Sequence, residues 1–170
     1  ALNDLGIGRG DRVAMVLPNS PETLAAFLAI GAGASTAPLN PAYRHEEYAY
    51  YLSDLGAKAL VVRADGGEEA RLARAAAEGH GIPVLELAAD YDGPAGSFCL
   101  QGGEAGTAAN PGFAQGDDEA LVLHTSGTTS KPKIVPLLQK NVAASAGNIR
   151  QVLQLSDSDI CLSIMPLFHI

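Results

Sequence analysis

The sequence predicts an α/β fold, doubly wound, with mainly parallel sheets and helices on both faces. Short apolar runs alternate along the chain with amphipathic stretches of helical length, which is the pattern of βαβ units around a parallel sheet. Right-handed crossovers between parallel strands then place helices on both faces. Hydrophobic residues make up 47% of the 170 residues and charged residues 18%. The chain can therefore bury a sizeable core, and general disorder is excluded.

The first predicted elements are a strand, a helix and a strand. An apolar run at residues 12–17 predicts a buried strand. Ser20 and Pro21 then begin a helix, with the serine as N-cap and the proline at the first helical position. That helix continues to Ile30 and is apolar almost all round, so we expect it to be well buried. A second strand is predicted at residues 34–39.

The same alternation repeats in the next part of the chain. Apolar residues at helical spacing, with Tyr48 and Tyr51 among them, predict a helix that ends at Gly56. We expect its tyrosines to serve packing. A strand at residues 59–62, a helix at 68–78 and a strand at 83–87 complete a first α/β lobe, residues 1–89.

Residues 90–118 break this rhythm because glycines and prolines interrupt them throughout. A loop of this length is usually functional or a linker. We therefore expect a long, poorly ordered connection between the first lobe and the start of a second lobe, residues 119–170. In that second lobe the patterns predict strands at 120–124, 134–138 and 160–164 and a helix at 141–153.

Composition and charge exclude several classes of protein. The net charge of −8 disfavours a basic nucleic-acid-binding surface. No apolar run approaches the roughly 20 residues that cross a bilayer, and the chain opens without a secretory signal, so we expect a cytoplasmic protein with no membrane span. Cys99 and Cys161 lie far apart without other metal ligands. They predict reduced, partly buried thiols rather than a disulfide or a zinc site.

Both ends of the sequence resemble cut points. The chain begins without methionine, and it ends on an apolar Phe-His-Ile run instead of a polar tail. The expectation is therefore a fragment of a longer protein.

The segment at residues 124–133 carries the chemistry. A predicted strand leads into five hydroxyl residues, Gly127 and two lysines. Glycine lets the backbone approach a ligand, hydroxyl and N–H groups donate to anionic oxygens, and lysine adds a positive charge. No Asp or Glu occurs from Ala120 to Ser156, although the whole chain is acidic. The segment therefore predicts a site for a phosphate chain, and the alternative is an inert, solvated turn.

Two common nucleotide motifs do not fit this chain. A Walker A loop needs Gly-Lys followed by Ser or Thr, whereas Lys131 is preceded by Ser130 and followed by Pro132. The glycines near residues 6–10 and 31–33 lack the spacing or the preceding strand of a Rossmann fingerprint. We interpret them as turns and helix ends.

The segment Thr125-Ser-Gly-Thr-Thr-Ser-Lys-Pro-Lys133 resembles the phosphate-binding loop of the adenylate-forming (ANL) superfamily, the acyl-CoA synthetases and other AMP-dependent synthetases and ligases. Met165-Pro-Leu-Phe-His169 resembles the next motif of that family, which lies beside the acyl pocket. Residues 8–20 and 38–41 also resemble its amino-terminal region. The resemblance covers nearly the whole chain and implies the amino-terminal part of an ANL-type large domain.

Within the family, the chain is most similar to the oxalate–CoA ligase branch. Ser130 with the following Lys-Pro-Lys, then Val-Pro-Leu137 and Asn141, carry that similarity, and other branches usually have glycine at the position of Ser130. The chain departs from the family at Ile134, where glycine is usual. Isoleucine prefers extended backbone and fills space, so we expect it to stiffen the exit of the loop or hinder its closure.

The resemblance implies an acid–thiol ligase that adenylates a carboxylic acid with ATP, releases pyrophosphate and forms a thioester with CoA. It makes His169 the catalytic residue where the carboxylate meets the α-phosphate, and Phe168 a wall of the acyl pocket. A Mg²⁺ ion held by the phosphates would be reached by the hydroxyl of Thr128. Oxalate is the leading acid, ahead of malonate-like or medium-chain acids. The residues implied around the ATP phosphates are Thr125, Ser126, Gly127, Thr128, Thr129, Ser130, Lys131 and Lys133.

The later motifs of the family are not found in these 170 residues. We therefore expect the chain alone to lack ligase activity, and its unpartnered apolar surface to favour self-association. Two alternatives stay open: a standalone nucleotide- or anion-binding module without catalysis, and an α/β scaffold without a ligand.

Overall fold

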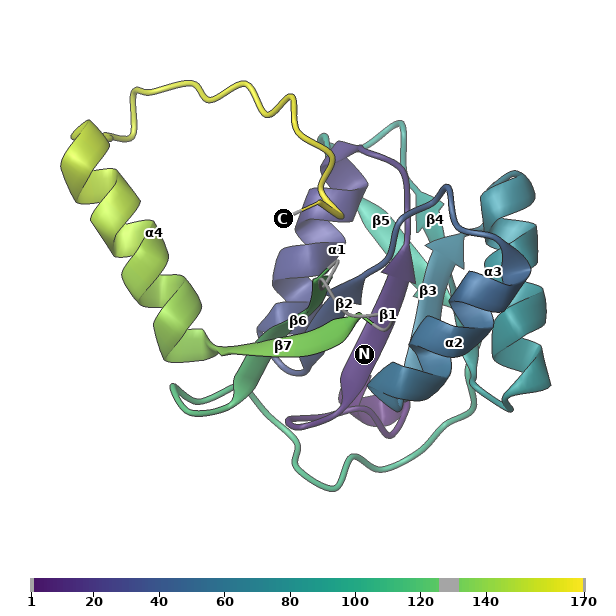
Figure 1. The fold of residues 1–170 in the computed structure, drawn as a ribbon. Helices are drawn as coiled ribbons and strands as arrows, with labels where there is room; N and C mark the ends of the chain where they lie inside the picture. The colour runs from purple at the N-terminus through teal and green to yellow at the C-terminus, as the bar shows by residue number, and fades with distance from the viewer. Residues whose placement is uncertain (1, 126–131, 170) are drawn as a thin grey trace.

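The computed structural model describes residues 2–125 and 132–169. They form a seven-stranded sheet with helices on both faces (Figure 1). The strand order is β5-β4-β3-β1-β2-β6-β7. Strands β1, β2, β3, β4 and β6 run parallel, while β5 and β7 are antiparallel edge strands. The predicted α/β fold with a mainly parallel sheet is confirmed.

The elements follow the predicted order closely. The strands are β1 (Arg12–Val16), β2 (Ser35–Pro38), β3 (Ala59–Arg63), β4 (Val84–Ala89), β5 (Phe98–Gln101), β6 (Glu119–Thr125) and β7 (Lys133–Leu138). The helices are a short 3₁₀ turn (Leu2–Asp4), α1 (Pro21–Gly31), α2 (His45–Leu55), α3 (Glu68–Gly79) and α4 (Gln139–Leu153).

The alternation of side chains along β1 divides the interior into two cores. Ala14 and Val16 point to the face that α2 and α3 cover, where they pack near Leu52 and Leu60. The residues that alternate with them, Val13 and Met15, belong to the core on the face that α1 covers, as does Leu17 just after the strand (Figure 1). A strand buried on both faces needs this continuous apolar run, because successive side chains point in opposite directions.

Helix α1 begins as predicted but is less buried than expected. The hydroxyl of Ser20 accepts a hydrogen bond from the backbone N–H of Thr23 at 3.2 Å, and Pro21 occupies the first helical position. Ala26 and Ile30 face the core, whereas Leu28 is 62% exposed. The expectation of burial all round was wrong because the sheet takes up only one side of the helix.

The structure corrects two strand predictions. Residues 98–101 form β5, which pairs antiparallel with β4 inside the segment predicted to be a connection. Residues 160–164, predicted as a strand, have no regular secondary structure, and Ile160 is 97% exposed. An apolar run of strand length does not form a strand by itself, because a neighbouring strand must pair with it. Cys99 and Cys161 are both exposed, which corrects their predicted partial burial.

The strand that leads to residue 125 belongs to the same sheet as the first lobe. β6 pairs with β2 through Thr36 and Leu121, and the hydroxyl of the buried Thr36 donates to the carbonyl of Ala120 at 3.1 Å. The connection before it is hydrogen-bonded to the body, for example from Gly106 N–H to the Asp4 carbonyl at 2.8 Å. The division into lobes at residues 90–118 stays a prediction, and strands from both sides of it share one sheet.

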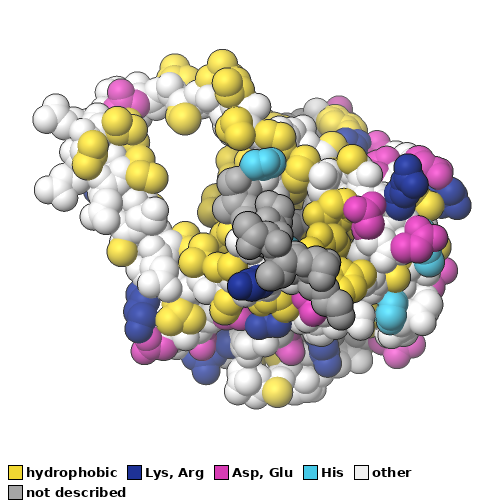
Figure 2. Space-filling view, viewed as in Figure 1, with side chains coloured by type: hydrophobic (Ala, Val, Ile, Leu, Met, Phe, Trp, Pro, Cys, Tyr) yellow, Lys and Arg dark blue, Asp and Glu magenta, His cyan; other side chains and the backbone are white. Residues whose placement is uncertain are grey.

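Helix α4 extends away from the sheet, and the chain after it returns toward the body near α1 (Figure 1). Apolar side chains lie exposed along this arm, and Figure 2 shows them around an open space beside the body. Within residues 2–125 and 132–169, no helix has both the length and the apolar character needed to cross a membrane. The exposed apolar side chains of the arm are Val142, Ile149, Val152, Leu153, Leu155, Ile160, Leu162, Ile164 and Met165.

Candidate functional site

A cavity of about 440 Å³ lies where β2 and β6 end. Ligands of parallel α/β sheets bind at this carboxyl edge of the strands, because the loops that follow the strands diverge there. The cavity is lined by Pro38, Leu39, Asn40, Tyr43, Tyr51, Leu123, His124, Thr125, Phe168 and His169. Three of these residues, Thr125, Phe168 and His169, were predicted from the sequence.

The two ends of the predicted phosphate loop are held side by side. Thr125, the last residue of β6, pairs with Lys133, the first residue of β7. Thr125 is half-buried and lines the cavity, while Lys133 is exposed. The loop residues between them, Ser126, Gly127, Thr128, Thr129, Ser130 and Lys131, lie outside the described residues. Ile134 pairs with His124 and packs against the core on the α2 face.

The segment at 165–169 reaches the same cavity from the far end of the chain. The amide of Asn19, in the loop between β1 and α1, accepts a hydrogen bond from the backbone N–H of Leu167 at 2.8 Å and donates to the carbonyl of Met165 at 3.3 Å. These two bonds attach the segment to the carboxyl edge of the sheet. Phe168 is half-buried and His169 is exposed, and both line the cavity.

His124 is a site residue that the sequence did not single out. Its Nε2 lies 3.2 Å from Asp54 Oδ2 on α2, and its side chain is only 6% exposed. Burial lowers the pKa of His124 below its ordinary value, against the opposing effect of the Asp54 carboxylate. We conclude that the ring is neutral near pH 7. Because an ionised carboxylate only accepts hydrogen bonds, Nε2 carries the hydrogen.

Aromatic side chains continue from this histidine along the cavity wall. Tyr51 packs edge-on against His124 with ring centroids 4.6 Å apart, and Tyr43 stacks on Tyr51 at 4.8 Å. Tyr48 is fully buried, and its hydroxyl donates to the carbonyl of Asn40 at 3.2 Å. Burial raises the pKa of both Tyr43 and Tyr48, so both stay neutral. The packing role predicted for these tyrosines is confirmed for Tyr48, whereas Tyr51 also faces the cavity.

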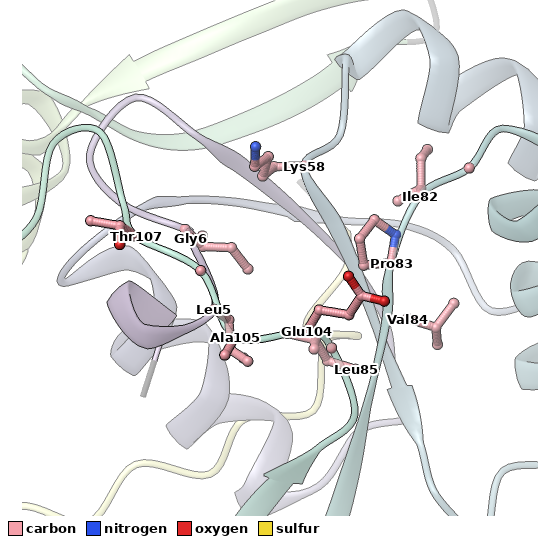
Figure 3. A pocket seen from close by; sticks show the side chains of 14 residues that line it. Leu5, Gly6, Lys58, Ile82, Pro83, Val84, Leu85, Glu104, Ala105 and Thr107 are labelled. Carbon is pink, nitrogen blue, oxygen red and sulfur yellow. The ribbon is translucent and has the colours of Figure 1, made fainter.

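A larger cavity, of about 670 Å³, lies at the opposite edge of the sheet, before β3 and β4 begin (Figure 3). Its charged side chains are Lys58 and Glu104, both exposed. Among the described residues that line it, none was predicted from the sequence to bind a phosphate chain or an acid. The smaller cavity at the carboxyl edge is therefore the candidate site.

The described lining of the candidate site offers hydroxyl, amide and imidazole groups and no carboxylate. In the described parts of the chain, no group of three or more His, Cys, Asp or Glu residues could hold a metal ion. Such a lining fits Mg²⁺ only as a companion of phosphates and water, because Mg²⁺ often uses few protein oxygens when phosphates supply the rest. It also fits a short anionic ligand, for which hydroxyl and imidazole groups serve as donors.

The profile of one known family, described as AMP-binding enzyme, matches residues 1–170. The chain belongs to the AMP-binding enzyme family. A probable CoA ligase from Humulus lupulus is 40% identical over 97% of this chain and 31% of its own length. An oxalate–CoA ligase from Arabidopsis thaliana is 40% identical over 99% of this chain and 33% of its own length. The chain thus spans about a third of the length of the curated relatives that it matches.

The fold of the chain also matches that of a solved structure. ATP-bound MatB from Rhodopseudomonas palustris aligns with a TM-score of 0.73 and 29% identity over 99% of this chain and 32% of that protein. The resemblance to acyl-CoA synthetases inferred from the loop at residues 125–133 is therefore confirmed.

Proposed function

We propose that this chain is the amino-terminal portion of an ATP-dependent carboxylate–CoA ligase. The intact enzyme would adenylate a carboxylic acid with release of pyrophosphate and then transfer the acyl group to CoA. One observation carries the proposal. Both ends of the phosphate loop, Thr125 and Lys133, lie beside the cavity that Phe168 and His169 line, at the carboxyl edge of the sheet. ATP phosphates and an acid would meet there.

Each proposed role follows from the chemistry of the group. Hydroxyl and N–H groups of residues 125–130, with Lys131 and Lys133 at their edge, would bind the β- and γ-phosphates and stabilise the leaving pyrophosphate. Thr128 would reach a Mg²⁺ ion held by those phosphates. The exposed imidazole of His169 would donate to the anion where the acid meets the α-phosphate, and Phe168 would form a wall of the acyl pocket.

We propose oxalate as the leading candidate for the carboxylic acid that the intact enzyme adenylates. The relative from Arabidopsis thaliana that is named an oxalate–CoA ligase, at 40% identity, supports this choice. The similarity around Ser130, which is part of the same sequence likeness, points to the same branch. A short, polar diacid also suits a cavity of about 440 Å³ lined by hydroxyl, amide and imidazole groups.

The proposal also covers the behaviour of the chain by itself. The chain alone would lack ligase activity, since it spans about a third of the length of its relatives. The exposed apolar arm formed by α4 and residues 155–165 would favour self-association of the chain. Size-exclusion chromatography with light scattering over a concentration series tests this, and a monomer at every concentration would contradict it.

The test of the function is ATP–pyrophosphate exchange in the intact protein, with oxalate against a panel of mono- and dicarboxylic acids. Exchange with oxalate and little with the other acids is expected. Exchange with another acid only would keep the ligase and overturn oxalate as its substrate. A folded protein that binds ATP without exchange for any acid would favour the nucleotide-binding module instead.

A further inference from the structure

A column of side chains joins helix α2 to the end of β6. Asp54 and Tyr51 on α2 both contact His124, the former at 3.2 Å between Oδ2 and Nε2 and the latter edge-on at 4.6 Å between ring centroids. Tyr43 extends the column by stacking on Tyr51. The His124 side chain is 6% exposed, so the column is a packed contact and not a chance meeting of surface groups.

His124 lies in the sheet next to the two residues that flank the phosphate loop. It is the residue before Thr125, where the phosphate loop begins, and it pairs across the sheet with Ile134, the residue after Lys133. The pair formed by His124 and Ile134 therefore lies directly beneath both ends of the loop. Whatever fixes His124 also fixes the points from which the loop starts and to which it returns.

We propose that His124 is a positioning residue for ATP: through Asp54 and Tyr51 it holds the end of β6 against α2, and so it fixes Thr125 and Lys133, the two described residues that flank the phosphate loop. This inference rests on the proposed function. Its Nε2–H is taken up by Asp54, so the histidine acts through the strand and not by donating to the phosphates. It reduces the ordering that Thr125 and Lys133 would need when ATP binds, because pre-positioned binding groups lose less conformational freedom.

The hydrogen bond to Asp54 and the ring contact with Tyr51 constrain His124 in different ways. The Nε2–H donates to the Asp54 carboxylate, and a hydrogen bond to a charged acceptor is stronger than one between neutral groups. The edge-on contact with Tyr51 fixes the plane of the ring. A substitution that removes the donor should loosen the end of β6, while one that keeps a donor at the position of Nε2 should preserve the attachment. Glutamine meets that requirement because its terminal amide reaches nearly as far.

The experiment uses the intact protein with His124→Ala, His124→Gln, Asp54→Ala and the double variant His124→Ala/Asp54→Ala. Glu86→Gln is the matched control, because Glu86 also forms a partly buried ion pair, with Arg74 at 2.6 Å, between a helix and a strand far from the cavity. The readouts are KM for ATP, KM for the acid and kcat in pyrophosphate exchange, together with the midpoint of thermal unfolding.

We expect His124→Ala and Asp54→Ala each to raise KM for ATP about tenfold, the effect of losing one hydrogen bond to a charged group. The double variant should raise it no further than the larger single effect, since both substitutions break one contact. His124→Gln should recover most of the loss. KM for the acid should not change, and Glu86→Gln should behave as wild type.

Lower thermal stability with an unchanged KM for ATP would overturn the proposal, because it would make the column purely structural. Additive effects of the two substitutions would also contradict it. If the wild type shows no exchange with any acid, the proposed function fails separately. Calorimetric titration with ATP and Mg²⁺ then decides: weaker binding in both alanine variants supports the positioning role, and equal binding or none overturns it.

Discussion

The ion pair between Arg12 and Glu119 fixes β6, the strand that leads to the phosphate loop, and its removal gives a sharp prediction. Glu119 accepts two hydrogen bonds from the Arg12 guanidinium, at 2.7 Å from Nε and 2.8 Å from Nη2. Arg12 also donates to the carbonyl of Leu55, at the end of α2, at 3.1 Å. The arginine thus connects β1, α2 and β6. The perturbation is Glu119→Gln, which keeps the shape of the side chain and removes its charge.

The structure sets the size of the effect. The two side chains are 28% and 17% exposed, so solvent screens the pair only in part. A hydrogen bond to a charged group stabilises by about 1.5–3 kcal/mol net, and glutamine retains a weaker one. We therefore expect the free energy of unfolding to fall by about 2 kcal/mol. For a chain of this size that corresponds to a drop in Tm of about 4–8 °C.

The assay is urea unfolding of the chain followed by circular dichroism, with Glu68→Gln as the control. Glu68 forms the same bidentate pair with Arg71, but both side chains are about two-thirds exposed, at 66% and 65%. Exposed pairs contribute little, so the control should unfold as the wild type does. An equal loss of stability in the two variants would show that burial does not distinguish the two ion pairs and would contradict this prediction.

The pH dependence of the same difference provides a second check. Burial acts to raise the pKa of Glu119, but the hydrogen bonds and charge of Arg12 outweigh it and lower the pKa below 4.5. A lowered carboxyl pKa contributes stability above the unfolded value, and that stability is lost as pH falls through the folded value. The gap between wild type and Glu119→Gln should therefore be full above about pH 5 and shrink in more acidic solution.

Three further predictions concern packing and protonation. Gly8→Ala should destabilise severely, because its new Cβ would collide with the carbonyl oxygen of Asn110 and lie 3.0 Å from Ala108 Cβ; the yield of folded protein and its unfolding midpoint check this. Leu52→Ala, at a fully buried position, should cost about 2–5 kcal/mol in urea unfolding, and a loss below 1 kcal/mol would contradict the packing. Stability should fall as pH drops below about 6.5, because burial lowers the pKa of His124 and only the unfolded ring then binds a proton; His124→Gln should remove that slope.

Local patterns predicted most of the fold because the elements are locally determined. Ser20 and Pro21 define the start of α1, and Gly56, with a φ of +58°, ends α2 in the left-handed conformation that glycine tolerates. The phosphate loop is likewise a contiguous motif, so its composition alone predicts a phosphate chain as its ligand, and this stays a prediction.

The missed features depend on pairing and contact partners that the local sequence pattern does not show. Residues 98–101 become a strand because β4 offers an edge to pair with, and residues 160–164 have no such neighbour in the described structure. His124 and Asp54 lie 70 residues apart, so no spacing rule links them. A signal that could have identified His124 is its place as a polar residue at the end of an apolar strand, directly before the hydroxyl-rich loop.

We propose that this chain supplies the phosphate and acid sites of an AMP-forming ligase. A decisive experiment incubates the intact protein with ATP labelled at the α-phosphorus, Mg²⁺ and oxalate without CoA, and identifies the labelled product. We expect an oxalyl-adenylate and unlabelled pyrophosphate, with the adenylate lost when Lys131 and Lys133 are both replaced by alanine. Labelled ADP instead of an adenylate would contradict it, as would an adenylate that forms equally well in that double variant.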